Sequence, residues 1–196
     1  MTRKHAFSTA MLVSALCIGF FCAALPAAAQ GYNEAFIYQF GDGNAAVVYQ
    51  QAQNSRTVQY QLGSGNQLFV YQSGEGNAAV QIQEGQANAA FAHLMGSHNT
   101  AIQSQMGSGN RLVLQQIGSG NMLLQDQIGS QNEAVLRVQG ERNAVNHRQV
   151  GSNHTAYVAI TGHNNTFDHV QIGYGTDLRV VHMGNDTVIS TLRVVF

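Results

Sequence analysis

Histidine is the residue type in this chain that most directly suggests chemistry, because a neutral imidazole binds metal ions and transfers protons near neutral pH. Seven histidines follow residue 30. Two of them, His147 and His169, are 22 residues apart, and they could chelate a divalent ion together with His154, His163 or His182. Whether these side chains meet depends on the elements that carry them.

Glycine pairs suggest a second chemistry, nucleotide binding. Gly41–Gly43, Gly63–Gly65 and Gly107–Gly109 each resemble part of a phosphate-binding loop. Such a loop lies between a strand and a helix, whereas these pairs recur at regular spacing and no helical pattern follows them. We therefore expect turns at these positions. No Ser-His-Asp or paired-carboxylate arrangement is left once the repeat described below is taken into account, so we expect no enzyme activity, no cofactor and no small-molecule substrate.

An eleven-residue repeat, Gln-x-Gly-x-x-Asn, dominates the chain. In steps of eleven from residue 41, glycine fills thirteen of fourteen positions, and Ala52 is the exception. Asparagine follows three residues later in ten of the fourteen units. A fixed repeat without insertions indicates a stacked architecture. The predicted turn glycines are Gly41, Gly63, Gly74, Gly85, Gly96, Gly107, Gly118, Gly129, Gly140, Gly151, Gly162, Gly173 and Gly184.

Each unit is typical of one strand and one turn. In residues 110–116, "NRLVLQQ", every second residue forms a row with polar ends and apolar residues between them. Because a strand places alternate side chains on one face, these seven residues are expected to form a strand. The other four residues form a turn, where glycine permits a positive φ or a close backbone approach.

The third position of that row shows that two units make one coil. Polar residues occupy it at 59, 81, 103, 125, 147, 169 and 191, and apolar residues occupy it at 48, 70, 92, 114, 136, 158 and 180. The single exception is Ile37, which is apolar in the polar series. The period is therefore 22 residues, because a three-sided coil would mix polar and apolar residues in every column.

The expected fold is all-β: a two-sheet parallel β-solenoid with 22-residue coils, each made of two 7-residue strands and two 4-residue glycine turns. About seven and a half coils at about 4.8 Å each would span roughly 36 Å. Identical amides then stack and bond along the axis. The predicted ladder comprises Gln39, Gln61, Gln83, Gln105, Gln127, Gln149 and Gln171; Gln59, Gln81, Gln103 and Gln125; and Asn44, Asn66, Asn77, Asn88, Asn99, Asn110, Asn121, Asn132, Asn143 and Asn165.

This period gives the histidines a structural interpretation. His147 and His169 continue the Gln103–Gln125 column, so we expect them to stack about 4.8 Å apart as hydrogen-bonding substitutes for glutamine. We favour this role over a metal site.

Residues 1–29 are predicted to be a secretory signal peptide, and residues 30–196 a single repeat domain. Arg3 and Lys4 precede a short apolar run, and Ala27 and Ala29 are placed for cleavage before Gln30. The run is short for a membrane span. Both cysteines lie within it, so the processed chain has no disulfide. It carries seven arginines, no lysine and ten acidic residues, a net charge of −3 that does not favour nucleic-acid binding.

Both ends of the repeat domain are expected to be open. The segments 33–41 and 187–196 still follow the alternation, and neither shows an obvious cap. Unpaired strand edges can continue into a neighbouring copy, and a head-to-tail contact that does not close produces filaments. A capped monomeric solenoid is the alternative.

The repeated motif resembles the curlin repeats of curli fibre subunits, most clearly at Gln39–Asn44, Gln61–Asn66, Gln105–Asn110 and Gln127–Asn132. The resemblance covers essentially all of residues 30–196. It implies a secreted functional amyloid on a Gram-negative cell surface, supporting biofilm matrix, adhesion and aggregation. It also implies a nucleating subunit and an outer-membrane export pore with accessory proteins as partners.

Two departures from the curlin pattern leave alternatives open. The repeat begins close to Gln30, with no export segment before it, and the last units replace asparagine with His154, Thr176 and Thr187. A minor subunit that nucleates or anchors fibres could have such a divergent end. A surface enzyme or ligand-binding solenoid is a third possibility, for which the sequence offers no residues.

Overall fold

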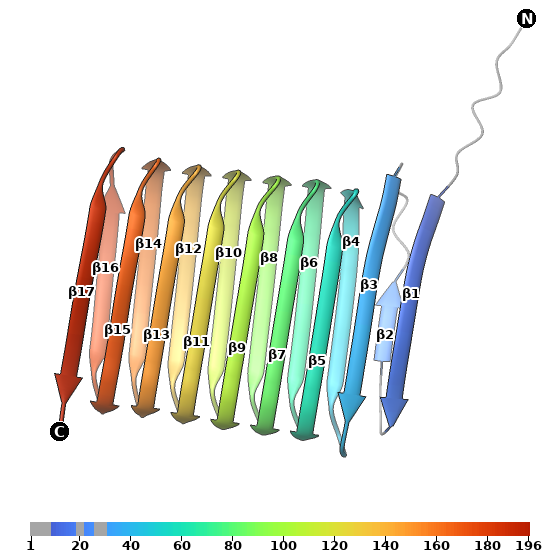
Figure 1. Cartoon of the computed structure of the whole chain (residues 1–196), viewed down its shortest axis with the longest axis horizontal. Helices are drawn as coiled ribbons and strands as arrows, with labels where there is room; N and C mark the ends of the chain where they lie inside the picture. Colours follow the sequence, from blue (N-terminus) through green and yellow to red (C-terminus); the bar gives the residue numbers. More distant parts are fainter. Residues whose placement is uncertain (1–8, 19–21, 26–30) are drawn as a thin grey trace, which may run out of the picture.

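The regular elements in the part of the chain that the structure describes are all strands, arranged as two stacked parallel sheets (Figure 1). A computed structural model describes residues 9–18, 22–25 and 31–196. None of these residues forms a helix that is long and apolar enough to cross a membrane. The strands are β1 (Thr9–Ile18), β2 (Cys22–Leu25), β3 (Gly31–Phe40), β4 (Ala45–Gln53), β5 (Arg56–Ser64), β6 (Gln67–Glu75), β7 (Ala78–Gln86), β8 (Ala89–Ser97), β9 (Thr100–Ser108), β10 (Arg111–Ser119), β11 (Met122–Ser130), β12 (Glu133–Glu141), β13 (Ala144–Ser152), β14 (Thr155–His163), β15 (Thr166–Tyr174), β16 (Asp177–Met183) and β17 (Val188–Val195).

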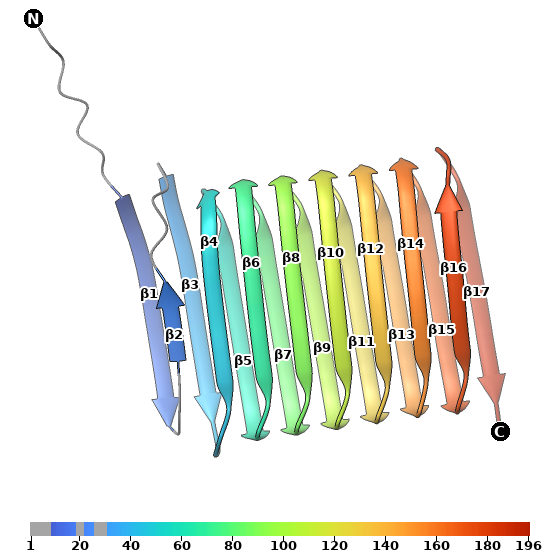
Figure 2. The ribbon, with the colours of Figure 1, turned by 180° about the vertical axis from the view of Figure 1, so that it is seen from behind.

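Consecutive strands alternate between the two sheets (Figures 1 and 2). The odd-numbered strands form a nine-stranded sheet, here the odd sheet, and the even-numbered strands form an eight-stranded sheet, here the even sheet. Each strand pairs in parallel with the strand 22 residues away, so that Gln81 lies opposite Gln103 and Gly85 opposite Gly107. The predicted 22-residue, two-sheet parallel β-solenoid is confirmed.

The strands are longer than predicted and the connections are shorter. Most strands contain nine residues, and two residues connect them, as at Gly109–Asn110 between β9 and β10. The repeated glycine therefore lies inside a strand: Gly107 still pairs with Gly129 of the next coil. The prediction of seven-residue strands was wrong at this boundary, because the glycine backbone continues the ladder instead of starting the reversal.

The repeated glycine is required by both conditions that the sequence suggested. At Gly107 φ is +121°, and an added Cβ would lie 2.0 Å from the carbonyl oxygen of Gly129. Gly184 is the exception among the predicted turn glycines, because its φ is not positive. The reversal itself uses a left-handed residue two positions later, which is glycine in some coils and another residue in others, such as His98 at φ 56° and Gln131 at φ 56°.

The interior lies between the sheets and combines apolar and amide columns. Buried apolar side chains such as Leu112, Leu136 and Phe167 fill the centre, and glutamine and asparagine side chains are buried beside them. Because every coil stacks directly on the next, most columns repeat one kind of side chain along the axis, with exceptions such as Leu94 in a glutamine column. The core is therefore continuous from β3 to β15.

Part of the predicted signal peptide extends both sheets in this full-length structure. Strand β1 pairs with β3 and β2 pairs with β4. Residues 1–8, 19–21 and 26–30, which include the predicted cleavage site, lie outside the described residues. Removal of the segment remains a prediction, and it would make β3 and β4 the N-terminal edge strands.

Candidate functional site

The glutamines of the odd sheet form two continuous amide ladders. In the first, each Nε2 donates to the Oε1 of the glutamine 22 residues later, from Gln39 to Gln171, at 2.6–3.0 Å. The second runs from Gln59 to Gln125 at 2.7–2.9 Å. The remaining amide hydrogen bonds across the core: Gln105 Nε2 lies 3.1 Å from the carbonyl oxygen of Ala89 in the even sheet. Each buried amide thus joins neighbouring coils and the two sheets.

The asparagines bind the glycine turns of the next coil. The Oδ1 of Asn110 accepts the backbone N–H of Asn132 at 3.1 Å, and its Nδ2 donates to the carbonyl oxygen of Gly129 at 2.9 Å. The same pair of bonds recurs in both sheets, for example at Asn121. The geometry accounts for the motif, because glutamine, glycine and asparagine each supply one part of the bonding between coils.

The even sheet contains amide bonds that the sequence prediction missed. Gln50 donates to Gln72 at 2.8 Å, and Gln116 donates to the carbonyl oxygen of Thr100 at 3.0 Å. The column is interrupted by Leu94, which leaves Gln116 Oε1 buried without a donor. The signal in the sequence was the 22-residue spacing of Gln50 and Gln72, which the apolar residues further along the column obscured.

The second glutamine ladder stops at the histidines. Gln125 Nε2 and both ring nitrogens of His147 are buried without hydrogen-bond partners among the described residues. The rings of His147 and His169 stack 5.5 Å apart at 7°, and the Nδ1 of His169 contacts Thr191 Oγ1. Burial, with His169 and His154 nearby, lowers the pKa of His147 to about 3. Burial also lowers the pKa of His169. His147 therefore stacks as expected but does not replace glutamine as a hydrogen-bonding group.

The histidines do not assemble into a metal centre in this structure. Parallel stacked rings direct their nitrogen lone pairs outward in the ring planes, which does not suit chelation of an ion between them. His154 is engaged instead with Val150 O at 3.1 Å and Thr176 Oγ1 at 2.7 Å. No group of three or more histidine, cysteine or acidic side chains in the described ranges is arranged to hold a metal ion.

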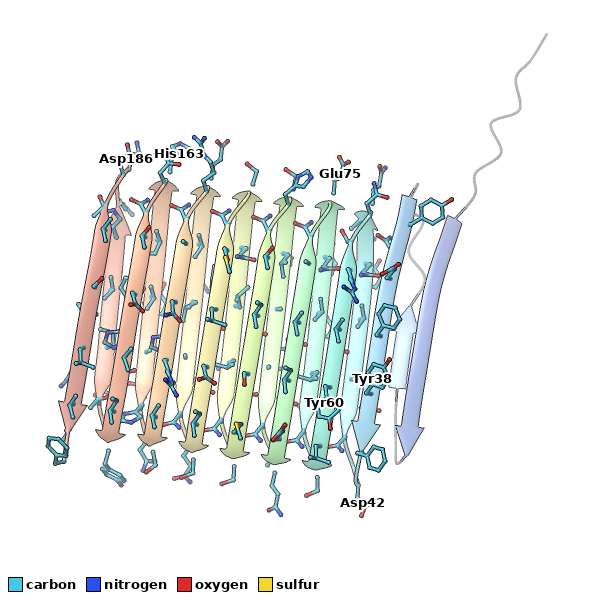
Figure 3. All side chains as sticks on the ribbon, in the orientation of Figure 1. Tyr38, Asp42, Tyr60, Glu75, His163 and Asp186 are labelled. Carbon is cyan, nitrogen blue, oxygen red and sulfur yellow. The ribbon has the colours of Figure 1, made fainter. Side chains whose placement is uncertain are left out.

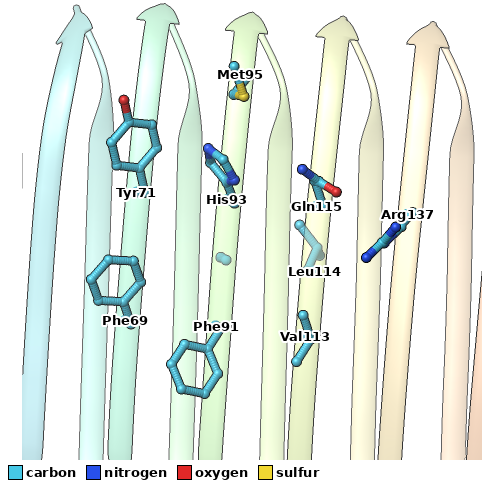
Figure 4. A pocket seen from close by; sticks show the side chains of 10 residues that line it. Phe69, Tyr71, Phe91, His93, Met95, Val113, Leu114, Gln115 and Arg137 are labelled. Carbon is cyan, nitrogen blue, oxygen red and sulfur yellow. The ribbon is translucent and has the colours of Figure 1, made fainter.

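The outer surface changes character along the axis (Figure 3). Over β6 to β12 the even sheet carries a shallow apolar groove (Figure 4), lined by Phe69, Tyr71, Phe91, His93, Met95, Val113, Leu114, Gln115 and Arg137, with Ala92. Its aromatic residues follow one another in columns, with the ring centroids of Phe69 and Phe91 6.2 Å apart and the rings tilted by 40°. On the odd sheet, the middle of the later strands carries polar side chains, as where Asn146 donates to Asp168 at 2.9 Å, while Met183, Val188 and Leu192 are exposed at the C-terminal edge. The coils from β6 to β12 thus present an apolar face on the even sheet.

The two ends of the domain present complementary chemistry. At the C-terminal edge, His182 of β16 and Arg193 of β17 occupy the columns that hold glutamine elsewhere, and Arg193 donates to the carbonyl oxygen of Asp177. Strands β3 and β4 become the opposite edge when residues 1–29 are removed; in the full-length structure, where β1 and β2 pair with them, Gln39 Oε1 and Gln50 Oε1 are buried and accept no hydrogen bond from the described residues. One edge therefore offers the guanidinium donor of Arg193 and the other offers amide acceptors.

Comparison with known proteins does not assign the chain to a family: no protein-family model, curated protein or solved structure matches it. The functional proposal therefore rests on the geometry of the ladders and edges and on the sequence pattern.

The importance of the ladder can be tested at its centre with Gln105→Leu. Gln105 accepts from Gln83 at 2.7 Å and donates to Gln127 at 3.0 Å, so the substitution leaves Gln127 Oε1 buried without a donor. We expect a loss of about 1–3 kcal/mol of folding free energy, measured by guanidinium titration. Gln115→Leu, on the outer face of β10, is the control and should change stability by less than about 0.5 kcal/mol. Equal effects of the two substitutions would contradict a structural role for the ladder.

Proposed function

We propose that this protein is a secreted structural subunit that self-assembles head to tail into extracellular, curli-like functional amyloid fibres. The observation that carries the proposal is the pair of complementary edges on an in-register amide ladder. Strand edges expose unpaired backbone N–H and C=O groups, and natural sheets normally cover them. Here each edge keeps the register of the strands inside the domain, with amides at the N-terminal edge and His182 and Arg193 in the same columns at the C-terminal edge.

The energetics favour continuation of the ladder. Docking of a second copy would pair the edge strands and bury Gln39 Oε1 and Gln50 Oε1, which β1 and β2 cover in the full-length structure. Each oxygen then needs a donor from the other copy, because a buried amide oxygen without one costs about 1–3 kcal/mol. Because the N-terminal edge contacts the C-terminal edge of another copy, the contact does not close on itself and growth continues as a filament.

The biological setting comes from the sequence resemblance to curlin repeats and from the predicted signal peptide. In this proposal the chain is exported from a Gram-negative cell through an outer-membrane pore with accessory proteins, and a nucleating subunit starts the fibre. The fibres would serve as biofilm matrix and support adhesion and cell aggregation. The apolar groove over β6 to β12 offers a surface for lateral contacts.

A minor subunit that nucleates or anchors fibres is the alternative, and the replacement of asparagine by His154, Thr176 and Thr187 in the late coils favours it. In that case the C-terminal coils, residues 143–196, would bind the cell surface. Cells that produce the chain without a partner fibre subunit would then retain it on the outer membrane as short assemblies.

The proposal is tested with the processed chain, recovered in denaturant and diluted to micromolar concentration. We expect sigmoidal growth of thioflavin fluorescence, removal of the lag by preformed fibres, and fibre reflections near about 4.7 Å and 10 Å. Sequencing of the exported product should begin at Gln30. A folded β-rich monomer that does not polymerise would contradict the fibre function and leave the anchoring alternative.

A further inference from the structure

The two edges of the solenoid are steps rather than flat faces. At the C-terminal end β17 of the odd sheet lies half a coil beyond β16 of the even sheet (Figures 1 and 2). After removal of residues 1–29, β3 of the odd sheet likewise precedes β4. Two copies can therefore meet in phase, with β3 against β17, or out of phase, with β3 against β16. In-phase docking leaves a gap one strand wide in the even sheet, between β16 and β4.

We propose that successive subunits dock half a coil out of phase, with β3 of one copy pairing with β16 of the preceding copy and β4 pairing with β17. This inference rests on the proposed function, since it takes the processed chain to polymerise. Each subunit is then turned by about half a revolution around the fibre axis relative to the last. The two sheets run in opposite directions (Figure 1), so this rotation makes β3 parallel to β16 and keeps its inward face inside.

The only apolar exception in the polar column supports this docking. Ile37 lies in β3, in the column that continues as Gln59, and Gln59 Oε1 consequently has no donor among the described residues. Out of phase, Ile37 would stack on Val180 of β16 and continue the apolar column of the even sheet. In phase, it would stack on Thr191 of β17, in a polar column. Ile37 therefore differs from the polar residues of its own column within the chain, but it matches the apolar column of the preceding copy.

The glycine column has non-glycine residues at two strand ends, Ala52 of β4 and Val195 of β17, and it is compatible with the same arrangement. Glycine is needed where its Cα faces the carbonyl oxygen of a glycine in the next coil, as Gly41 faces Gly63. Out of phase, Gly41 follows Gly184, and Ala52 of β4 follows Val195 of β17. The two non-glycine residues at these strand ends therefore meet each other. In phase, Val195 would precede Gly41 instead. The Cβ of Val195 faces a carbonyl oxygen of the next copy in either arrangement, so this column permits out-of-phase docking but does not by itself select it.

The orphan amide oxygens provide the third observation. Inside the domain the earlier coil donates and the later coil accepts, as from Gln61 to Gln83. Out of phase, the guanidinium of Arg193, which can only donate, faces Gln50 Oε1, and His182 faces Gln39 Oε1. In phase, Arg193 faces Gln39, and Gln50 lies across the gap without a donor. Only the out-of-phase contact places a donor side chain opposite both oxygens.

Two double-cysteine variants separate the two arrangements. The processed chain has no cysteine of its own. Leu192 on the outer face of β17 would lie beside Tyr49 of the next copy out of phase, and beside Tyr38 in phase. Strand neighbours about 4.8 Å apart suit a disulfide, which spans roughly 4.4–6.8 Å between Cα atoms. The variants Leu192→Cys with Tyr49→Cys and Leu192→Cys with Tyr38→Cys share the same C-terminal cysteine, so each is the matched control of the other.

Fibres of both variants are oxidised mildly and separated on non-reducing gels, with electron microscopy of the same samples. We expect a ladder of covalent multimers from the Tyr49→Cys pair and monomers from the Tyr38→Cys pair. Out-of-phase docking would be overturned if the fibres cross-link through the Tyr38→Cys pair, through both pairs equally or through neither pair. None of these results would contradict the fibre function. Absence of fibres from the variants and the unmodified chain alike would overturn the fibre function itself, and this docking with it.

Discussion

Replacing Gly107 with alanine is expected to disrupt the solenoid at its centre. The new Cβ would lie 2.0 Å from the carbonyl oxygen of Gly129, so the two coils must separate there. Separation breaks the bond from Asn110 Nδ2 to that oxygen and leaves the Gly129 carbonyl without this donor. The lost bond and the strain of a positive φ together predict a loss of roughly 2–5 kcal/mol. Guanidinium titration at a fixed protein concentration measures this loss.

Gly109→Ala is the matched control, two residues away. Gly109 also has a positive φ, of +64°, but the nearest atom to an added Cβ is Gln131 Cγ at 3.8 Å. The equivalent residue in another coil is Ala87, which adopts a φ of 53°. We expect only the backbone strain, about 1–2 kcal/mol. If Gly109→Ala were as damaging as Gly107→Ala, close stacking of glycine on carbonyl oxygen would not be the reason for the repeat.

Acid is expected to loosen the C-terminal coils around His147. The pKa of this side chain is lowered from 6.5 to about 3 in the folded chain, chiefly by burial. Between pH 6.5 and about pH 3, the unfolded chain binds a proton at His147 that the folded chain excludes. The contribution of neutral His147 to the free energy of unfolding is therefore fully present above pH 6.5 and is lost as the pH decreases toward 3. At pH 4 the expected loss is about 3 kcal/mol. Hydrogen exchange should show it first in β13 and β15.

His147→Gln tests this explanation directly. Glutamine at this position would accept from Gln125 Nε2, which has no hydrogen-bond partner among the described residues, and would continue the ladder. We expect the variant to be more stable than the unmodified chain at pH 7 and to lose less stability at pH 4. The residual loss belongs to His169, whose pKa is also lowered by burial. His98→Gln, in an exposed connection, should keep the original acid response. An unchanged acid response in His147→Gln would show that another group causes the loosening.

The architecture was predictable because the 22-residue repeat determines both the number of sheets and the side chains that share a column. The polar and apolar alternation at the third inward position, seen in Gln81 against Val70, distinguishes two sheets from three. The spacing of Gln105 and Gln127 places amides in one column before any coordinate is known. Parallel in-register stacking needs no further information, since each coil repeats the register of the last.

The local details were less predictable because they depend on backbone contacts between coils. The repeated glycine was predicted to lie in a turn, yet Gly107 belongs to the end of strand β9. The reversal follows at Gly109–Asn110. Residues as different as His98 and Arg142 adopt the left-handed conformation at the reversal, so residue type does not mark it. The isolated ring nitrogens of His147 were missed for a similar reason. A histidine can occupy a glutamine column sterically without reproducing the geometry of its hydrogen bonds.

The number of chains per unit length of fibre tests the central claim most directly. A solenoid of about seven and a half coils that stacks end to end adds one chain per about 36 Å. Scanning transmission electron microscopy of unstained fibres measures mass per length, and the account predicts one processed chain in that distance for a single filament. A value near one chain per about 4.8 Å would mean that each chain contributes a single layer, as in ordinary cross-β stacking. That result would contradict assembly of preformed solenoids through their edges.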